Sequence, residues 1–170
     1  MTSEKFHTDI LPLRNKLYRY ALSIVLDVSL AEDVLQEVFI KLWTKRDHLD
    51  TVQNQEAWCI RMVRNQSIDR LRQRNRQPDM LTRIHDQTAD PTLPGHLVEQ
   101  EDLLEKIRET IKCLPEQQAE IFRLRELMGY SNAEIEDILQ LNHSQVKVNL
   151  HRARKLVRDR IKKIMNYGVQ

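Results

Sequence analysis

Apolar residues recur every three or four positions in two long stretches of this sequence, and the pattern stops between residues 77 and 97. Such spacing gathers apolar side chains on one face of a helix. Only three glycines occur and aromatic residues are sparse, which argues against the many tight turns of a sandwich or barrel. The sequence therefore predicts an all-α chain made of two small helical domains.

The first domain, residues 1–77, is predicted to be a three- to four-helix bundle. The first helix covers roughly residues 11–27, and the last covers residues 55 to about 74. Between them, the capping box Ser29–Glu32 marks the start of a second helix, because its hydroxyl and carboxylate satisfy free backbone amides. Trp43 and Trp58 lie on the apolar faces of these helices, so we expect both in the core.

Residues 78–97 have the composition of a flexible linker. Pro78, Pro91, Pro94 and Gly95 fall in this stretch, mixed with Asp, Thr and Gln. Proline and glycine interrupt helices, and polar residues give such a segment nothing to bury. The second domain is therefore expected over residues 98–170.

A helix-turn-helix is predicted in the second domain. The capping box Ser131–Glu134 starts a short helix, and Asn142 with Gln145 caps a long basic one after a three-residue turn. A second helix of this kind can lie in the major groove of DNA. Its outward residues are Lys147, Val148, His151, Arg152 and Lys155.

Charge is unevenly distributed, although the formal net charge is only +2. Basic residues dominate 61–76 and 147–163, whereas acids dominate 86–109. Two basic surfaces are typical of a bipartite polyanion binder, and the acidic stretch could screen them in the free chain. Two solvated helix faces would give the same pattern, so charge alone leaves both interpretations open.

Several classes of function find no support in the sequence. Cys59 and Cys113 are far apart and the histidines lack paired ligand spacing, so we expect two buried free thiols, no metal and no cofactor. There is no nucleophile elbow or phosphate loop, which predicts a protein that is not an enzyme. No long apolar stretch occurs, so we expect no membrane insertion and a cytoplasmic location.

Three segments resemble motifs of one family, the bacterial RNA polymerase sigma factors. They are residues 31–43 (AEDVLQEVFIKLW), residues 57–72 (AWCIRMVRNQSIDRLR) and the helix-turn-helix over residues 114–154. The resemblance spans nearly the whole chain outside the linker and the ends. Two domains in this order resemble the small extracytoplasmic-function (ECF) type of the sigma-70 superfamily.

The resemblance implies a transcription initiation factor that binds core RNA polymerase, directs it to promoters and helps to melt them. The polymerase-binding residues would be Asp33, Gln36, Glu37 and Ile40. The minus-10 element would be bound by Arg61, Arg64, Asn65, Asp69 and Arg72. The five outward residues of the basic helix would read the minus-35 element.

The chain departs from the family pattern in places. Asn142–Ser144 stand where many relatives have a small residue or glycine in the turn, and Val148–Asn149 replace a commoner Ser-Arg pair. Because Val148 and Asn149 differ from the common pair, the promoter sequence that a relative prefers cannot be transferred to this chain. The family also implies regulation by synthesis or by an anti-sigma factor, and we expect a monomer when free. The alternative from another class is a stand-alone dimeric helix-turn-helix regulator.

Overall fold

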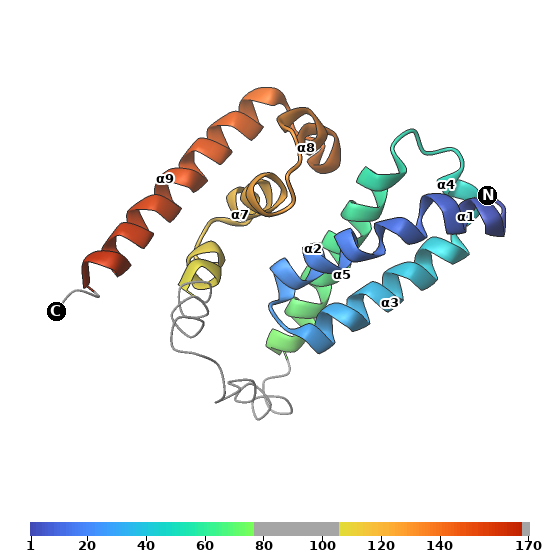
Figure 1. The fold of residues 1–170 in the computed structure, drawn as a ribbon, viewed down its shortest axis with the longest axis horizontal. Helices are drawn as coiled ribbons and strands as arrows, with labels where there is room; N and C mark the ends of the chain where they lie inside the picture. Colours follow the sequence, from blue (N-terminus) through green and yellow to red (C-terminus); the bar gives the residue numbers. More distant parts are fainter. Residues whose placement is uncertain (77–105, 168–170) are drawn as a thin grey trace.

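The structure is a computed structural model that describes residues 1–76 and 106–167 (Figure 1). Every regular element in these two ranges is helical, which confirms the predicted all-α class. The predicted linker over residues 78–97 and the first residues of the second domain lie outside the described residues. None of the described helices combines the length and apolar character needed to cross a membrane.

The N-terminal half is a helical bundle. Its elements are α1 (Ser3–Asp9), the 3₁₀ turn η1 (Leu11–Leu13), α2 (Arg14–Val25), α3 (Val28–Thr44), α4 (Arg46–Leu49) and α5 (Gln55–Arg76). Helices α2, α3 and α5 pack on one another pairwise. The fully buried side chains between them include Leu17, Tyr20, Val34, Val38, Leu42, Ile60 and Val63. The helical spacing of apolar residues therefore placed the core on the correct faces.

Helix α3 begins before the predicted capping box. Leu26 takes a left-handed conformation, with φ of 54°, that ends α2, and the next residue, Asp27, caps α3. The Asp27 carboxylate accepts a hydrogen bond from the Leu30 amide at 2.9 Å. Ser29 consequently lies inside the first turn, and the capping box predicted there is wrong. Aspartate caps as well as serine does, and the tight turn after α2 selects the earlier residue.

Helix α1 was not predicted, and it changes the position of Trp43. Phe6 of α1 is buried and meets the Trp43 ring edge-on at 5.1 Å between centroids. Trp43 itself stays 40% exposed, with Arg46 above its ring, and Trp58 is only half-buried. The prediction that both tryptophans lie in the core is therefore wrong for Trp43, whereas Trp58 packs against the core as a partly buried residue. Trp43 instead serves as the platform on which α1 packs.

The C-terminal half contains the predicted helix-turn-helix. A helix over residues 106–112 precedes α7 (Glu116–Phe122), a π-helical turn η2 (Arg123–Leu127), α8 (Asn132–Leu139) and α9 (His143–Tyr167). The capping box at Ser131 and Glu134 is confirmed. Asn142 and Gln145 also cap reciprocally, at 2.9 and 3.0 Å. The left-handed residue of the turn is Gln140, so Asn142 is free to act as the cap.

The two halves share one buried apolar cluster. Residues of α2, α3 and α5 belong to the same cluster as eight buried residues of the C-terminal half, namely Ile121, Leu124, Met128, Tyr130, Ile135, Ile138, Val146 and Leu150. A smaller cluster joins α7 and α9 through Phe122, Ala153 and Val157. Helix α9 lies on the side of the C-terminal half that is remote from the N-terminal helices (Figure 1). The halves are therefore packed together, with α9 on the outside.

The two cysteines differ in environment. Both are free, but Cys59 of α5 is buried and Cys113 is exposed. The prediction of two buried thiols is therefore wrong for Cys113. Burial raises the pKa of the Cys59 thiol to about 12. Cys59 behaves as a small apolar core residue of α5.

Candidate nucleic-acid interface

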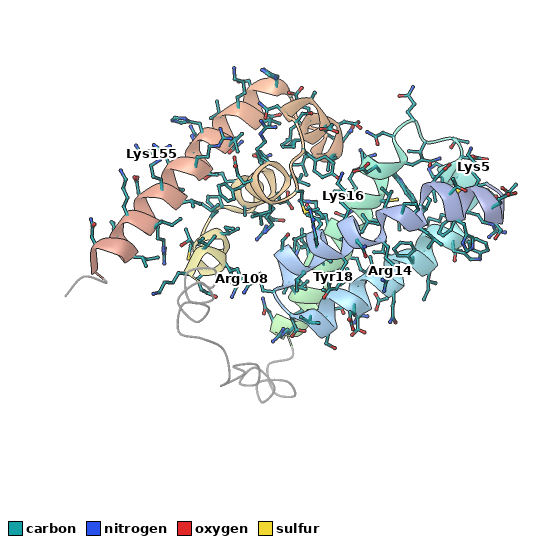
Figure 2. All side chains as sticks on the ribbon, in the orientation of Figure 1. Lys5, Arg14, Lys16, Tyr18, Arg108 and Lys155 are labelled. Atoms are coloured by element: carbon teal, nitrogen blue, oxygen red, sulfur yellow. The ribbon has the colours of Figure 1, made fainter. Side chains whose placement is uncertain are left out.

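Helix α9 presents the predicted minus-35 residues to solvent. Val146, Leu150, Ala153 and Val157 hold its other face against the domain. The five outward residues Lys147, Val148, His151, Arg152 and Lys155 are all exposed. Within the described residues, none of the five has a side-chain hydrogen bond or ion pair. Figure 2 shows Lys155 on the edge of α9 away from the N-terminal helices.

The chemistry of this α9 surface suits duplex DNA. Lysine and arginine can donate to guanine, and the methyl groups of Val148 can meet a thymine methyl. Val148 is 43% exposed, which leaves it available for such a contact. Arg154 is excluded from the surface because it pairs with Glu126 at 2.6 Å. The surface is therefore a narrow strip of uncommitted side chains.

Helix α5 carries the predicted minus-10 residues, but the structure divides them. Asn65, Asp69 and Arg72 are exposed, whereas Arg61 and Arg64 are half-buried against the C-terminal half. The Arg61 guanidinium donates to the backbone carbonyl of Asp137 at 3.2 Å. Arg64 binds Glu120 and lies 3.7 Å from Glu116. Sequence reasoning brought these arginines together but missed their partners.

Glu120 is the unusual member of this contact, because it is a carboxylate at a buried position on α7. Only 4% of the residue is exposed. Burial raises the pKa of Glu120, and the hydrogen bond from Arg64 offsets part of that rise. In the sequence Glu120 stands inside the apolar run Ala119–Phe122, which was the one available signal of a buried partner. The partner is Arg64, which lies 56 positions away in the sequence, so no local pattern could identify it.

Other arginines of α5 are paired within the N-terminal half. Arg70 binds Glu37 of α3, and Arg74 binds Asp27 at 3.2 Å. Glu37 also accepts a hydrogen bond from Gln66. The basic run over residues 61–76 is therefore not a continuous free surface, since three of its arginines already have carboxylate partners.

A cleft of about 430 Å³ lies between α5 and the C-terminal half. Arg61, Arg64 and Asn65 line it from α5. Glu116 and Glu120 of α7, with the end of α8 and the turn at Gln140, line it from the opposite side. The predicted minus-10 residues nearest the N-terminal end of α5 therefore face protein across this cleft.

Three of the four predicted polymerase-binding residues form an exposed strip on α3. Asp33, Gln36 and Ile40 are exposed, and Ile40 reaches 66%. Glu37, the fourth, is half-buried and bound to Arg70 of α5, so it does not belong to this exposed strip. A groove of about 320 Å³ runs beside the strip, between α3 and the segment around Leu11. An exposed aliphatic residue between polar ones suits contact with a partner helix.

A second polar contact joins the halves at Tyr130 and Lys16. The Tyr130 hydroxyl donates to the Glu56 carboxylate at 2.5 Å, and the Lys16 ammonium lies 4.2 Å from the centre of the Tyr130 ring. Lys16 also pairs with Glu56. Figure 2 shows Lys16 where the two halves meet. Nearby, the buried Arg123 donates to the Ser23 carbonyl at 3.0 Å.

Comparison with known proteins agrees with the two-part arrangement. Residues 10–77 match the family model described as Sigma-70 region 2, and residues 104–157 match Sigma-70, region 4. The chain is 30% identical over 131 residues to the RNA polymerase sigma factor SigZ of Bacillus subtilis, covering 75% of this chain and 70% of the relative. The chain belongs to the sigma-70 family. It is a sigma factor of the ECF type.

Relatives named as ECF sigma factors cover more of the chain. SigW of Bacillus subtilis is 28% identical over 160 residues, covering 88% of this chain and 84% of the relative. Among solved structures, the sigma factor RpoE in complex with the anti-sigma factor NepR, from Bartonella quintana, shares the fold. Its TM-score is 0.70 at 21% identity, over 94% of this chain and 98% of that one. CnrH in complex with the cytosolic domain of CnrY gives a TM-score of 0.71 at 20% identity, over 95% and 90%.

Membership of the family fixes the general activity. This sigma factor is a transcription initiation factor that binds core RNA polymerase and directs it to promoter DNA. The stand-alone dimeric regulator is not favoured, because the N-terminal half matches a region 2 that such a regulator does not need.

Proposed function

We propose that α9 reads the minus-35 element through Lys147, Val148, His151, Arg152 and Lys155. The observation that carries this proposal is that all five side chains are exposed and uncommitted on one strip of a helix-turn-helix. Arg152 and Lys147 would pair with guanine, and Lys155 would contact phosphate. Within the described residues, no side-chain hydrogen bond or ion pair of this strip has to break before it meets a duplex.

Helix α5 binds the minus-10 element, using Arg61, Arg64, Asn65, Asp69 and Arg72. Holding a base out of the stack costs a few kcal/mol unless side chains receive it. Asn65 offers both a donor and an acceptor to a base edge. The arginines hold the single-strand backbone, and Asp69 orients its neighbours. This assignment is supported by the exposure of Asn65, Asp69 and Arg72 on one helix.

The exposed strip of α3, made of Asp33, Gln36 and Ile40, docks on core RNA polymerase. Acids repel DNA, so this mixed surface fits a protein helix better than a phosphate backbone. Glu37 contributes indirectly, because its contacts with Gln66 and Arg70 fix α3 against α5. These contacts fix the position of the docking surface on α3 relative to the minus-10 surface on α5.

The remaining assignments follow from this role. The domains extend over residues 1–77 and 98–170, and the protein works in the cytoplasm, where its polymerase is. It catalyses no step itself. An anti-sigma factor regulates it, as NepR and CnrY partner the sigma factors of similar fold. The free protein is a monomer.

In vitro transcription tests the proposed function. Core RNA polymerase from the source organism is supplied with genomic upstream fragments, with and without the protein. Start sites should appear only with the protein, and Asn65→Ala or Arg152→Ala should each reduce them about tenfold or more, since each removes base contacts. Asn75→Ala and Arg160→Ala are the matched controls, because both change exposed residues of the same two helices outside the proposed sites. Equal loss in the controls would contradict the assignment.

A further inference from the structure

A row of basic residues on α9 continues beyond the residues proposed to read the minus-35 element. Lys147, His151 and Lys155 follow one another at intervals of four residues. Arg158 comes three residues after Lys155, and Lys162 comes four residues later. Residues at these intervals lie on one face of a helix, and all five are exposed. The basic row therefore extends about two turns past the proposed reading strip on the same face of α9.

The continuation of the row is not committed to other parts of the protein. Among residues 1–76 and 106–167, neither Arg158 nor Lys162 has a side-chain hydrogen bond or an ion pair. Asp159 is the only acid between Lys147 and Lys163. It lies seven residues after Arg152 and so belongs to the neighbouring row of the helix. An acid repels phosphate, whereas the basic row carries no acid over its whole length.

The opposite face of these last turns is packed against the domain. Val157 is 7% exposed, and Ile161 packs on the smaller apolar cluster. The helix over residues 106–112 supplies Ile107 and Ile111 to the same packing. The last turns are therefore a supported continuation of α9, in line with its first part (Figure 1).

Distance along the helix limits what the end of the row can meet. Lys162 lies about 22 Å along the helix from Lys147, at about 1.5 Å per residue. The major groove is only about 12 Å wide, and recognition helices contact base edges with their N-terminal residues. Arg158 and Lys162 consequently lie beyond the base edges that Lys147 and Arg152 are proposed to read. The DNA groups within reach of a cation there are the phosphates beside the groove.

We propose that Arg158 and Lys162 bind phosphates of the duplex directly outside the minus-35 element, on one side of it. This proposal rests on the proposed reading of that element by α9, and it adds a sequence-independent contact to that reading. The affinity for a promoter then depends on the duplex beside the element as well as on the element itself. Phosphate contacts on a supported helix also fix the register of the reading residues against the bases.

Anisotropy titrations of the full chain on three labelled duplexes test the proposal. One duplex carries the minus-35 element of an activated promoter and ends at the element. The other two extend it by about ten base pairs, roughly one helical turn, either upstream or downstream. We expect one of the two extensions to tighten binding about tenfold at low salt, because two further exposed ion pairs form.

Two variants assign this gain to the row. Arg158→Ala combined with Lys162→Ala should abolish the gain and leave binding of the shortest duplex unchanged. On the extended duplex, the slope of log affinity against log salt should become shallower by about two. Arg160→Ala is the matched control for Arg158→Ala alone. Arg160 follows the buried Ala153 by seven residues, so it lies beside the packed face and its loss should leave the gain intact.

Three results would overturn the proposal. If neither extension tightens binding, the row is left to an acidic protein surface. If the double variant retains the gain, other residues make the flanking contact. If Arg158→Ala and Arg160→Ala reduce the gain equally, the row acts only through net charge. Failure of the proposed reading looks different, because Arg152→Ala would then leave binding of the shortest duplex unchanged.

Discussion

The two basic helices of this sigma factor have similar compositions and different environments. In α5, Arg64, Arg70 and Arg74 have carboxylate partners and Arg61 has a carbonyl partner. In α9, the residues proposed to read DNA are exposed, and Arg154, which faces the domain, is the arginine that is paired. The α5 surface is therefore partly committed to protein contacts, whereas the residues of the α9 surface are not.

A run of arginines in the sequence therefore does not by itself define a free surface. The partners of Arg61 and Arg64 come from residues more than fifty positions away, on α7 and α8. Their effect is electrostatic and steric at once, because Glu120 is buried as well as charged. Availability therefore depends on the tertiary contact and not on composition.

The largest expected contrast concerns the packed side of α5. Cys59 lies on the face of α5 that packs in the apolar core, and reagents in solution should not reach this face in the native protein. Burial raises the pKa of Cys59 to about 12, so its thiolate is scarce at neutral pH. We expect native protein to alkylate at exposed Cys113 and at Cys59 at least about a thousandfold more slowly. Mass spectrometry after timed iodoacetamide treatment checks this, and comparable rates would show that α5 is loosely packed.

A smaller contrast is expected in stability. Arg123→Ala removes a buried donor and leaves the Ser23 carbonyl unsatisfied between the halves. We expect a loss of about 2 kcal/mol in the free energy of unfolding. Arg154→Ala is the matched change on α9, where the ion pair with Glu126 is partly exposed, and should cost less than about 1 kcal/mol. Urea denaturation measures both, and equal losses would remove the distinction between the two helices.

The smallest contrast lies in the salt dependence of duplex binding. Each phosphate contact lowers the slope of log affinity against log salt by about one. Lys155→Ala should therefore make that slope shallower by about one, whereas Arg64→Ala should leave it unchanged, because Arg64 is held by Glu120. Anisotropy titrations at several salt concentrations give the slopes. An equal change in the two variants would mean that α5 contacts the duplex in the closed chain.

Local signals in the sequence predicted most of the fold. The capping residues Ser131 and Asn142 fixed the starts of α8 and α9 because each cap is satisfied within three residues. The same reasoning failed at Ser29, where Asp27 competed for the same role two residues earlier. Helix α1 was missed because its stability depends on Phe6 meeting Trp43, a tertiary contact.

The site was predicted as a set of residues but not as an arrangement. Periodicity placed Lys147 through Lys155 on the outer face of α9, since burial of Val146 and Leu150 determines that face. The acidic stretch over residues 86–109 was the expected screen for the basic patches. It lies almost wholly outside the described residues. Glu120 supplies the observed contact instead, and nothing local in the sequence names Arg64 as its partner.

For this sigma factor to start transcription, the part of the α5 surface that contacts the C-terminal half must be uncovered, and transcription by a locked protein tests this requirement. Lys16 lies over Tyr130, and Glu134 is bound to the neighbouring Ser131, so both positions lie at the contact between the halves. In a protein that carries Lys16→Cys, Glu134→Cys and Cys113→Ser, a linker containing a cleavable disulfide joins positions 16 and 134, and this locked protein is added to core RNA polymerase on an activated promoter. Transcripts are counted before and after reduction. We expect little or no specific transcript from the locked protein, and recovery of the transcript once the linker is cleaved. Full activity of the locked protein would contradict this requirement.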